Sequence, residues 1–292
     1  MNWEQLHSRD FFPDPRLPLK ILRRAPQPPF PMHTHDFSEL VIVYDGRAVH
    51  YTDAGEEYPV SAGDVFVLQG DRAHSYRDLE NLNLVNVVFQ PDSLKLPWEE
   101  LYAIPGSEAL FKWEPRLRPR HGFRNRLRLE QKSLAAALAL VEDLERELEQ
   151  KKEGYPFMAT AFFMQLCGYL SRCYARDPDP AVQDIHRIGP VLSWLEARSF
   201  HPVTVADLTG RFPFSESSLL RLFHRVTGSS PLEYHARMRI RRGCEMLRNS
   251  EANVTEIAYR LGFRDSNYFS RQFRKIMGVS PLQYRKNHRV YS

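Results

Sequence analysis

Residues 253–284 read NVTEIAYRLGFRDSNYFSRQFRKIMGVSPLQY, a stretch that has the pattern of two short helices. Asn253 can cap the free amides of a first helix, and Glu256 follows three residues later, as a capping box requires. Gly262 stops that helix, and a second one fits residues 265–278 with its apolar side chains at helical spacing. The pattern therefore predicts a helix, a sharp turn and a second helix.

The same pattern occurs once more, about fifty residues earlier. The later copy has one extra residue in its turn, because the first helices are offset by 49 and the second helices by 50. The outer face of the later second helix carries Asn267, Arg271, Arg274 and Lys275, which are residue types that contact bases and phosphates. An isolated cationic helix is more often a solvated face, but the repeat favours nucleic acid. At the offset of 50, Leu219, Phe223, Gly228, Ser230, Pro231, Leu232 and Tyr234 recur as Phe269, Phe273, Gly278, Ser280, Pro281, Leu282 and Tyr284.

Two such units in tandem, joined by a helix over about 231–247, resemble the DNA-binding domain of the AraC/XylS family of transcription regulators. The resemblance implies an all-α domain over 187–288, with helix-turn-helix units at about 206–227 and 254–277. Each second helix would enter a major groove of double-stranded DNA, and the two grooves would lie about one turn of duplex apart.

The resemblance also assigns roles by position, as predictions. The base-contacting residues would be Ser217, Arg221, Asp265 and Asn267. The phosphate-contacting residues would be His224, Arg225, Arg271, Arg274 and Lys275. Glu256 and Asp265 would contact the RNA polymerase sigma subunit. For three of these residues a structural role is the alternative: Ser217 as a helix-start residue, Asp265 as an N-cap and Glu256 as half of a capping box.

Length and charge divide the chain in two. A chain of 292 residues suggests two domains. Residues 186–292 contain 18 Lys and Arg against 8 Asp and Glu, whereas the rest contains 22 against 28, so the basic end is expected to meet nucleic acid. The chain shows neither a membrane-spanning apolar run nor a signal peptide pattern, so we expect a cytoplasmic protein without a membrane partner.

Short β-rich runs between residues 37 and 89, separated by turn signals, predict a small barrel or jelly roll within a domain that spans 1–125. Its histidines, glutamate and glycines are spaced in a way similar to the two motifs of the cupin fold. In metal cupins three histidines and a glutamate bind one divalent ion, so the candidate metal ligands are His33, His35, Glu39 and His74. A metal-free ligand pocket and a purely structural role are the alternatives.

The same residues are the candidates for binding a small effector, together with Tyr44. Strand alternation places Tyr44 on the side opposite to Glu39, which makes it the weaker candidate. The predicted effector-binding residues are therefore His33, His35, Glu39, Tyr44 and His74.

Between the two domains, residues 97–125 lack clear periodicity and are interpreted as an irregular connection around the barrel. Residues 126–176 are predicted to be helical and to form a homodimer through a seam that includes Leu134, Val141 and Leu148, with packing on the chain's own barrel as the alternative. Residues 177–186 are interpreted as a linker.

Several stretches in both halves, including HSRDFF near the start and FPMHTHDFSELVIVYDG, resemble the rhamnose-responsive members of the AraC/XylS family. The resemblance implies a two-domain α+β protein: a cupin-like β-barrel, a helical dimerisation segment and two helix-turn-helix units. It also implies a transcription activator, not an enzyme, that responds to a small sugar, L-rhamnose, and controls sugar catabolism. The alternatives are a different sugar, or a cupin-type metal enzyme fused to a DNA-binding domain.

Overall fold

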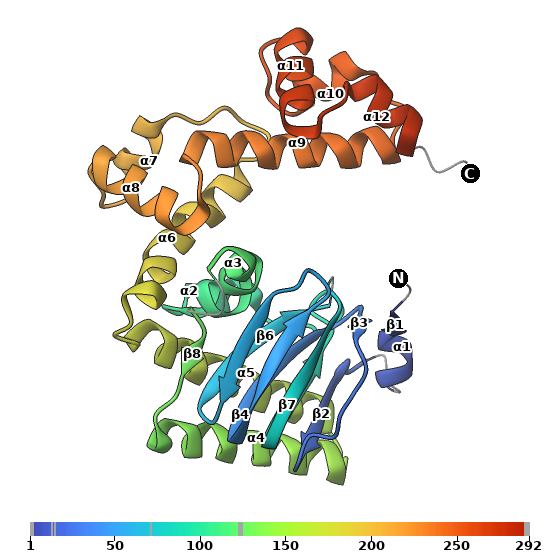
Figure 1. The fold of residues 1–292 in the computed structure, drawn as a ribbon, viewed down its shortest axis with the longest axis vertical. Helices are drawn as coiled ribbons and strands as arrows, with labels where there is room; N and C mark the ends of the chain where they lie inside the picture. Colours follow the sequence, from blue (N-terminus) through green and yellow to red (C-terminus); the bar gives the residue numbers. More distant parts are fainter. Residues whose placement is uncertain (1–2, 13, 15, 71, 122–124, 289–292) are drawn as a thin grey trace. The chain divides into compact units, whose positions relative to one another are not determined.

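The computed structural model describes residues 3–12, 14, 16–70, 72–121 and 125–288 (Figure 1). The chain forms two compact units, Met1–His186 and Arg187–Ser292. The first is rich in strands and the second is helical, so the expected two-domain α+β class is confirmed.

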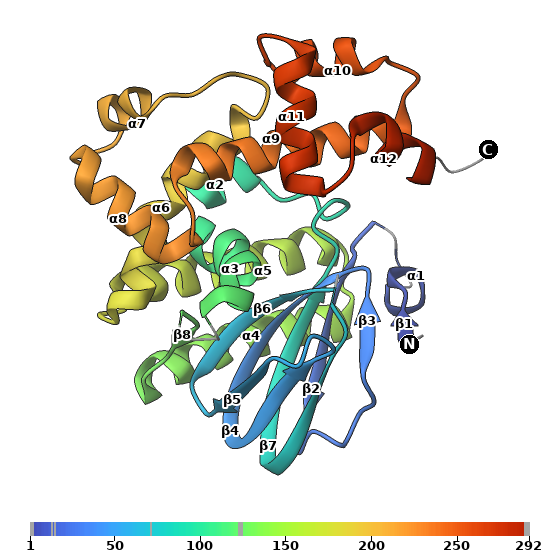
Figure 2. The ribbon, with the colours of Figure 1, turned by 45° about the horizontal axis from the view of Figure 1, so that its top comes forward.

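The first unit is built on one eight-stranded sheet. Its strands are β1 (Glu4–Leu6), β2 (Leu19–Arg24), β3 (His33–His35), β4 (Ser38–Thr52), β5 (Glu57–Ser61), β6 (Asp64–Gln69), β7 (His74–Phe89) and β8 (Leu127–Arg128). The order is β1-β3-β7-β4-β6-β8, with β2 also paired to β7 and β5 to β4. The long strands β4 and β7 pair antiparallel, and their register shifts between Val43 and Val49, which bends both strands (Figure 2).

Alternation along β4 separates two buried faces. Val41 and Val43 belong to an inner apolar cluster, whereas Leu40 and Ile42 point to the opposite face and are also fully buried. The helices α4 (Gln131–Gln150) and α5 (Tyr155–Arg176) pack against each other along one side of the sheet (Figures 1 and 2). The ring of Phe163 on α5 lies 5.0 Å from that of Phe89 on β7.

Three sequence-based interpretations of the connecting segments change. Residues 97–125 are largely helical and form α2 (Trp98–Ala103), the π-helix η1 (Glu108–Trp113) and α3 (Glu114–His121). The expected linker is partly helical too, because α6 begins at Pro180 and runs to Ala197. The predicted dimer seam is partly internal, because Val141 is fully buried within the first unit, whereas Leu134 and Leu148 are half-buried. The helix α4 packs on α5, and a homodimer through this seam stays a prediction.

The second unit holds two helix-turn-helix motifs. The first consists of α7 (Val205–Arg211) and α8 (Glu216–Thr227), and the second of α10 (Val254–Arg260) and α11 (Ser266–Met277). The helix α9 (Pro231–Asn249) joins them, and α12 (Pro281–His288) follows. Capping boxes start α7 and α10, and the turn of the second motif has one residue more than that of the first. No helix in the described part of the chain is long and apolar enough to span a membrane.

Candidate functional site

The helices α8 and α11 have the same length and each buries one apolar face, which leaves the opposite face to solvent. On α8 the exposed face carries Ser217, Arg221, His224 and Arg225, and on α11 it carries Asn267, Arg271, Arg274 and Lys275. The two sets correspond at the offset of 50 and follow one helical stripe, at i, i+4, i+7 and i+8. All eight side chains can therefore reach a ligand, as a DNA interface requires.

The two remaining predicted residues, Asp265 and Glu256, form hydrogen bonds at the starts of helices. Asp265 caps α11, with its Oδ1 accepting a hydrogen bond from the amide of Tyr268 at 2.7 Å. Glu256 completes the capping box of α10, with its Oε2 accepting from the amide of Asn253 at 2.9 Å. Both carboxylates are exposed, so each keeps an oxygen for a partner. The structural role that the sequence left open for these two is present.

Tyr268 is an exposed residue of this interface that the sequence reasoning did not single out. It is 45% exposed on α11, and the guanidinium carbon of Arg271 lies 5.9 Å from the centre of its ring. At the corresponding position the first helix-turn-helix motif has Ser218. An exposed aromatic side chain beside arginine on a recognition helix can pack against bases or sugars. The signal that could have identified Tyr268 from the sequence is its position on the polar face of the helix.

In the first unit, a buried polar cluster forms where β3, β4 and β7 meet. The ligand atoms of His35, Glu39 and His74 lie within 4.8 Å of one another, and all three side chains are buried. Pairing of His33 on β3 with His74 on β7 brings the two histidine-bearing strands together, and the inward alternation of β4 adds Glu39. Three of the four predicted metal ligands therefore converge.

The protonation state of the histidines follows from their hydrogen bonds. Nδ1 of His35 lies 2.7 Å from the carbonyl oxygen of Phe37, and Nδ1 of His74 lies 3.2 Å from that of Arg72. Because a carbonyl can only accept, Nδ1 carries the proton and Nε2 keeps a lone pair. Among the described residues, Nε2 of His35, the hydroxyl of Tyr76 and Oδ1 of Asn86 are buried without a hydrogen-bond partner.

Burial favours the uncharged form of each of these groups. It lowers the pKa of His35 to about 4 and raises the pKa of Glu39 to about 7. The pKa of His74 is lowered well below its usual value, by burial first and then by the neighbouring histidines. The 3.9 Å approach of Nε2 of His35 to Oε1 of Glu39 is thus a contact between an uncharged imidazole and a carboxyl that titrates near neutrality.

Two imidazole lone pairs and a carboxylate are a ligand set that suits a divalent ion, so the residues present fit such a group. The carbonyl bonds to Nδ1 would fix the orientation of each imidazole, as in known metal sites. A bound ion would also offset the cost of ionising the buried Glu39.

Of the two remaining predicted effector residues, Tyr44 does not join this group, whereas His33 does. The prediction that Tyr44 belongs to the effector site is corrected. Side chains alternate along β4, so Tyr44 points to the face opposite to that of Glu39, and there it lies beside Arg23. His33 is buried beside the three ligands, with its ring 4.6 Å from that of His74 and its Nδ1 3.0 Å from the carbonyl oxygen of Pro31.

Other residues do join it. The ring of His50 lies 5.5 Å from that of His74 and 5.2 Å from that of Tyr76. Asn86 on β7 places its Nδ2 3.5 Å from Oε2 of Glu39. Asn86 was missed by the sequence reasoning, and its inward position in the alternating segment 82–88 was the signal that could have identified it.

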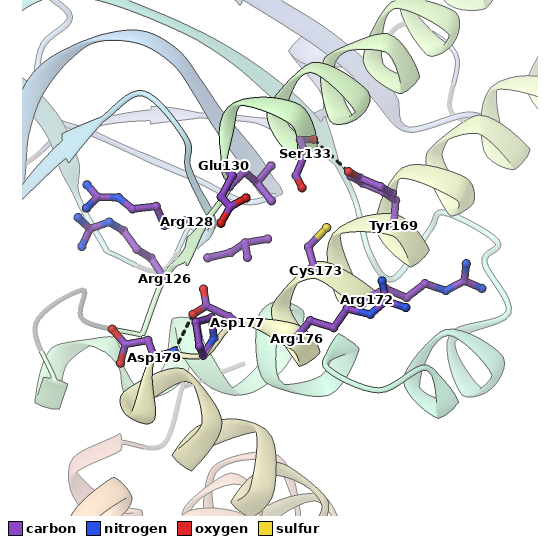
Figure 3. Close-up of a pocket in the computed structure, with 13 residues that line it drawn as sticks. Arg126, Arg128, Glu130, Ser133, Tyr169, Arg172, Cys173, Arg176, Asp177 and Asp179 are labelled. Atoms are coloured by element: carbon purple, nitrogen blue, oxygen red, sulfur yellow. Dashed lines mark hydrogen bonds between the residues drawn. The ribbon is translucent and has the colours of Figure 1, made fainter.

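An open pocket of about 710 Å³ lies where β8, α4 and α5 meet (Figure 3). Its charged groups are largely engaged: Arg126 and Arg128 both pair with Asp64, and the carboxylates of Asp177 and Asp179 accept hydrogen bonds from backbone amides. The pocket is the weaker ligand candidate, because buried polar atoms of the cluster lack hydrogen-bond partners, whereas four charged residues of the pocket are already paired or hydrogen-bonded.

Comparisons with known proteins cover both units. Residues 19–167 match the family described as AraC-like ligand binding domain, and residues 208–287 match a helix-turn-helix domain family. An activator named RhaS from Escherichia fergusonii is 33% identical over 287 residues, which cover 97% of each chain. The RhaS of Citrobacter koseri is 32% identical and an activator named RhaR from Mannheimia succiniciproducens is 29% identical, each over 96% of both chains.

Two solved structures are also similar. ToxT from Vibrio cholerae aligns with 92% of this chain and 97% of its own, at 16% identity and a TM-score of 0.33. The DNA-binding domain of AdpA, solved in complex with a target DNA, aligns with 35% of this chain and 91% of its own, at 30% identity and a TM-score of 0.33.

Proposed function

The chain belongs to the AraC family of DNA-binding transcription activators, and we propose that L-rhamnose, bound in the first unit, controls its activity. The observation that carries the proposal is the buried cluster around Glu39, in which Nε2 of His35, the hydroxyl of Tyr76 and Oδ1 of Asn86 have no hydrogen-bond partner among the described residues. Such atoms are costly to bury, and a ligand rich in hydroxyl groups can both donate to and accept from them.

On DNA, we propose that α8 and α11 enter successive major grooves, with Arg221 and Asn267 reading base edges. Arginine can bond guanine through two hydrogen bonds, and asparagine can bond adenine in the same way. His224, Arg225, Arg274 and Lys275 lie one or two turns further along each helix and would contact phosphates, where they set affinity and salt dependence.

In the effector site, His35 Nε2 would accept a hydrogen bond from a sugar hydroxyl, and the protonated form of Glu39, whose pKa is raised to about 7, can donate one. Tyr76 and Asn86 would complete the set from β7. The ligand set also supports a divalent ion held by His35, Glu39 and His74, which would act as a Lewis acid toward sugar hydroxyls when bound. Effector specificity would depend on where these donors and acceptors lie.

For assembly, we propose a homodimer through α5 instead of the partly internal seam of α4. One face of α5 exposes Phe157, Met158, Ala161 and Met164, with Phe157 77% exposed. An apolar stripe of this kind is unusual on a solvated helix and suits a second copy of the same helix across a two-fold axis.

For the contact with RNA polymerase, we propose that the exposed carboxylates of Glu256 and Asp265 bind the sigma subunit.

Calorimetric titration of the purified, metal-analysed protein with L-rhamnose tests the effector proposal, with L-arabinose, L-fucose and D-xylose as controls. We expect saturable binding of L-rhamnose and weaker or no binding of the others. Saturable binding of another sugar alone would reassign the effector. Turnover of any sugar, with a bound metal required, would instead support the cupin-type enzyme.

A further inference from the structure

The two helix-turn-helix motifs meet at a junction formed by α9, the turn of the second motif and the segment that follows α6. The turn is the place where the second motif has its extra residue, and Gly262 in it has a φ of +72°. A Cβ on Gly262 would lie 2.4 Å from the carbonyl oxygen of Phe200, which precedes the first motif. The inserted turn therefore packs directly against the other half of the unit.

Arg239 of α9 holds this turn from the other side. Its Nε donates to the carbonyl oxygen of Leu261 at 2.9 Å, and its guanidinium carbon lies 3.8 Å from the centre of the Phe263 ring. One helical turn earlier, Nε2 of His235 lies 3.0 Å from the carbonyl oxygen of Arg198. One face of α9 thus binds backbone from both halves.

The surroundings of Arg239 are unusual for an arginine. It is only 9% exposed, its Nη2 is buried without a hydrogen-bond partner, and among the described residues it has no carboxylate partner. Burial lowers its pKa. A buried, incompletely paired charge is costly, so stability alone does not explain Arg239 at this position. Its hydrogen bond to the carbonyl of Leu261 and its stacking on Phe263 are better explained if they orient the turn.

The first motif offers an internal comparison. Arg187 lies over Phe214, the counterpart of Phe263, with its guanidinium carbon 5.4 Å from the ring centre. Arg187 is exposed, and in the described chain it makes no hydrogen bond to the turn. The arginine–aromatic pair occurs in both motifs, but only the second is buried and connected to the other half.

We propose that Arg239 is a positioning residue that fixes the spacing and angle between the two recognition helices. The proposal rests on the proposed function, in which α8 and α11 bind successive major grooves. Two binding elements that are rigidly linked in the correct geometry gain affinity from their high effective concentration, and they reject sites whose spacing differs. Loss of the junction should therefore weaken spacing discrimination before it weakens either motif's own contacts.

The test is DNA binding by the full chain to duplexes that carry its selected two-part site at the native spacing and with one or two base pairs inserted or removed. For the wild type we expect a sharp optimum at the native spacing. Arg239→Met should lose about tenfold affinity at that spacing and much less at the others, which flattens the profile. Arg187→Met, the matched control, should keep the profile.

Gly262→Ala disturbs the junction from the opposite side and should flatten the profile in the same way. If Arg239→Met does not fold, Arg239→Lys, which keeps the charge, replaces it in the same measurement. Circular dichroism checks the folding of each variant. Equal loss at every spacing, or an unchanged profile, would overturn the role of Arg239. A wild type without any spacing optimum would instead overturn the proposal that both motifs bind DNA together.

Discussion

At the scale of single residues, Asn267 and Arg221 occupy exposed positions on helices whose opposite faces are fixed by buried phenylalanines and leucines. Replacing either with Ala should cost about 1 to 3 kcal/mol at one base pair of the site and relax specificity there. Competition binding with single-base variants of a selected site measures this. Lys275→Ala is the control and should weaken all sites alike; a uniform loss for Asn267→Ala would make Asn267 a phosphate contact.

Glu39 gives a prediction about pH. Burial raises its pKa from 4.5 to about 7, so the folded state favours the protonated carboxyl. This contribution to stability is fully present below pH 4.5 and is lost as the pH rises through about 7. In metal-free protein, Glu39→Gln should therefore stabilise the first unit by about 3 kcal/mol more at pH 8 than at pH 4.

Chemical denaturation of both proteins at the two pH values measures the difference, and comparing variant with wild type cancels the opposite contribution of the buried histidines. An added divalent ion should remove the advantage of Glu39→Gln, because a charged Glu39 would then have a partner. A pH-independent difference would mean that Glu39 has an ordinary pKa.

At this scale the sequence predicts which residues belong to a site, and which face of a strand they occupy, better than it predicts which side chains contact each other. The spacing of His35, Glu39 and His74 identified three members of the cluster, and simple alternation correctly weakened Tyr44. Asn86 was not predicted: the alternation of residues 82–88 places it on the inner face, but its contact with Glu39 depends on the register between β4 and β7, which that alternation does not give.

At the scale of secondary structure, the helix-turn-helix motifs were predicted from capping residues and glycines, since these signals are local. The partner of the seam on α4 could not be predicted in this way, because Val141 and its neighbours have the same pattern whether they face a second chain or another element of their own unit. Residues 97–125 were predicted irregular because prolines and charges mask short helices, which tertiary packing stabilises.

The proposed dimer surface leads to a prediction at the same scale. Phe157→Glu together with Met164→Glu should yield monomers in sedimentation velocity, because two charges would be buried at the interface. Ala139→Glu, on the exposed side of α4, is the control and should leave the dimer intact. A dimer that persists with both charges on α5 would place the interface elsewhere.

At the scale of the whole molecule, the proposed effector site and the DNA-binding helices belong to separate units, so the proposed regulation would be a coupling free energy between two sites. The sugar can shift the protein toward its activating state only by as much as it binds that state more tightly. Substitutions in the buried cluster should therefore move the sugar dependence of transcription while leaving the sequence preference on DNA unchanged.

The most direct test is the dose response to L-rhamnose of transcription from a promoter that carries the selected site. Tyr76→Phe removes one unpartnered hydroxyl from the cluster, and Tyr169→Phe removes the same group from the pocket at β8, α4 and α5. We predict a midpoint about tenfold higher for Tyr76→Phe and an unchanged midpoint for Tyr169→Phe. An unchanged response in Tyr76→Phe with a shifted one in Tyr169→Phe, or transcription that ignores L-rhamnose in every protein, would contradict the account.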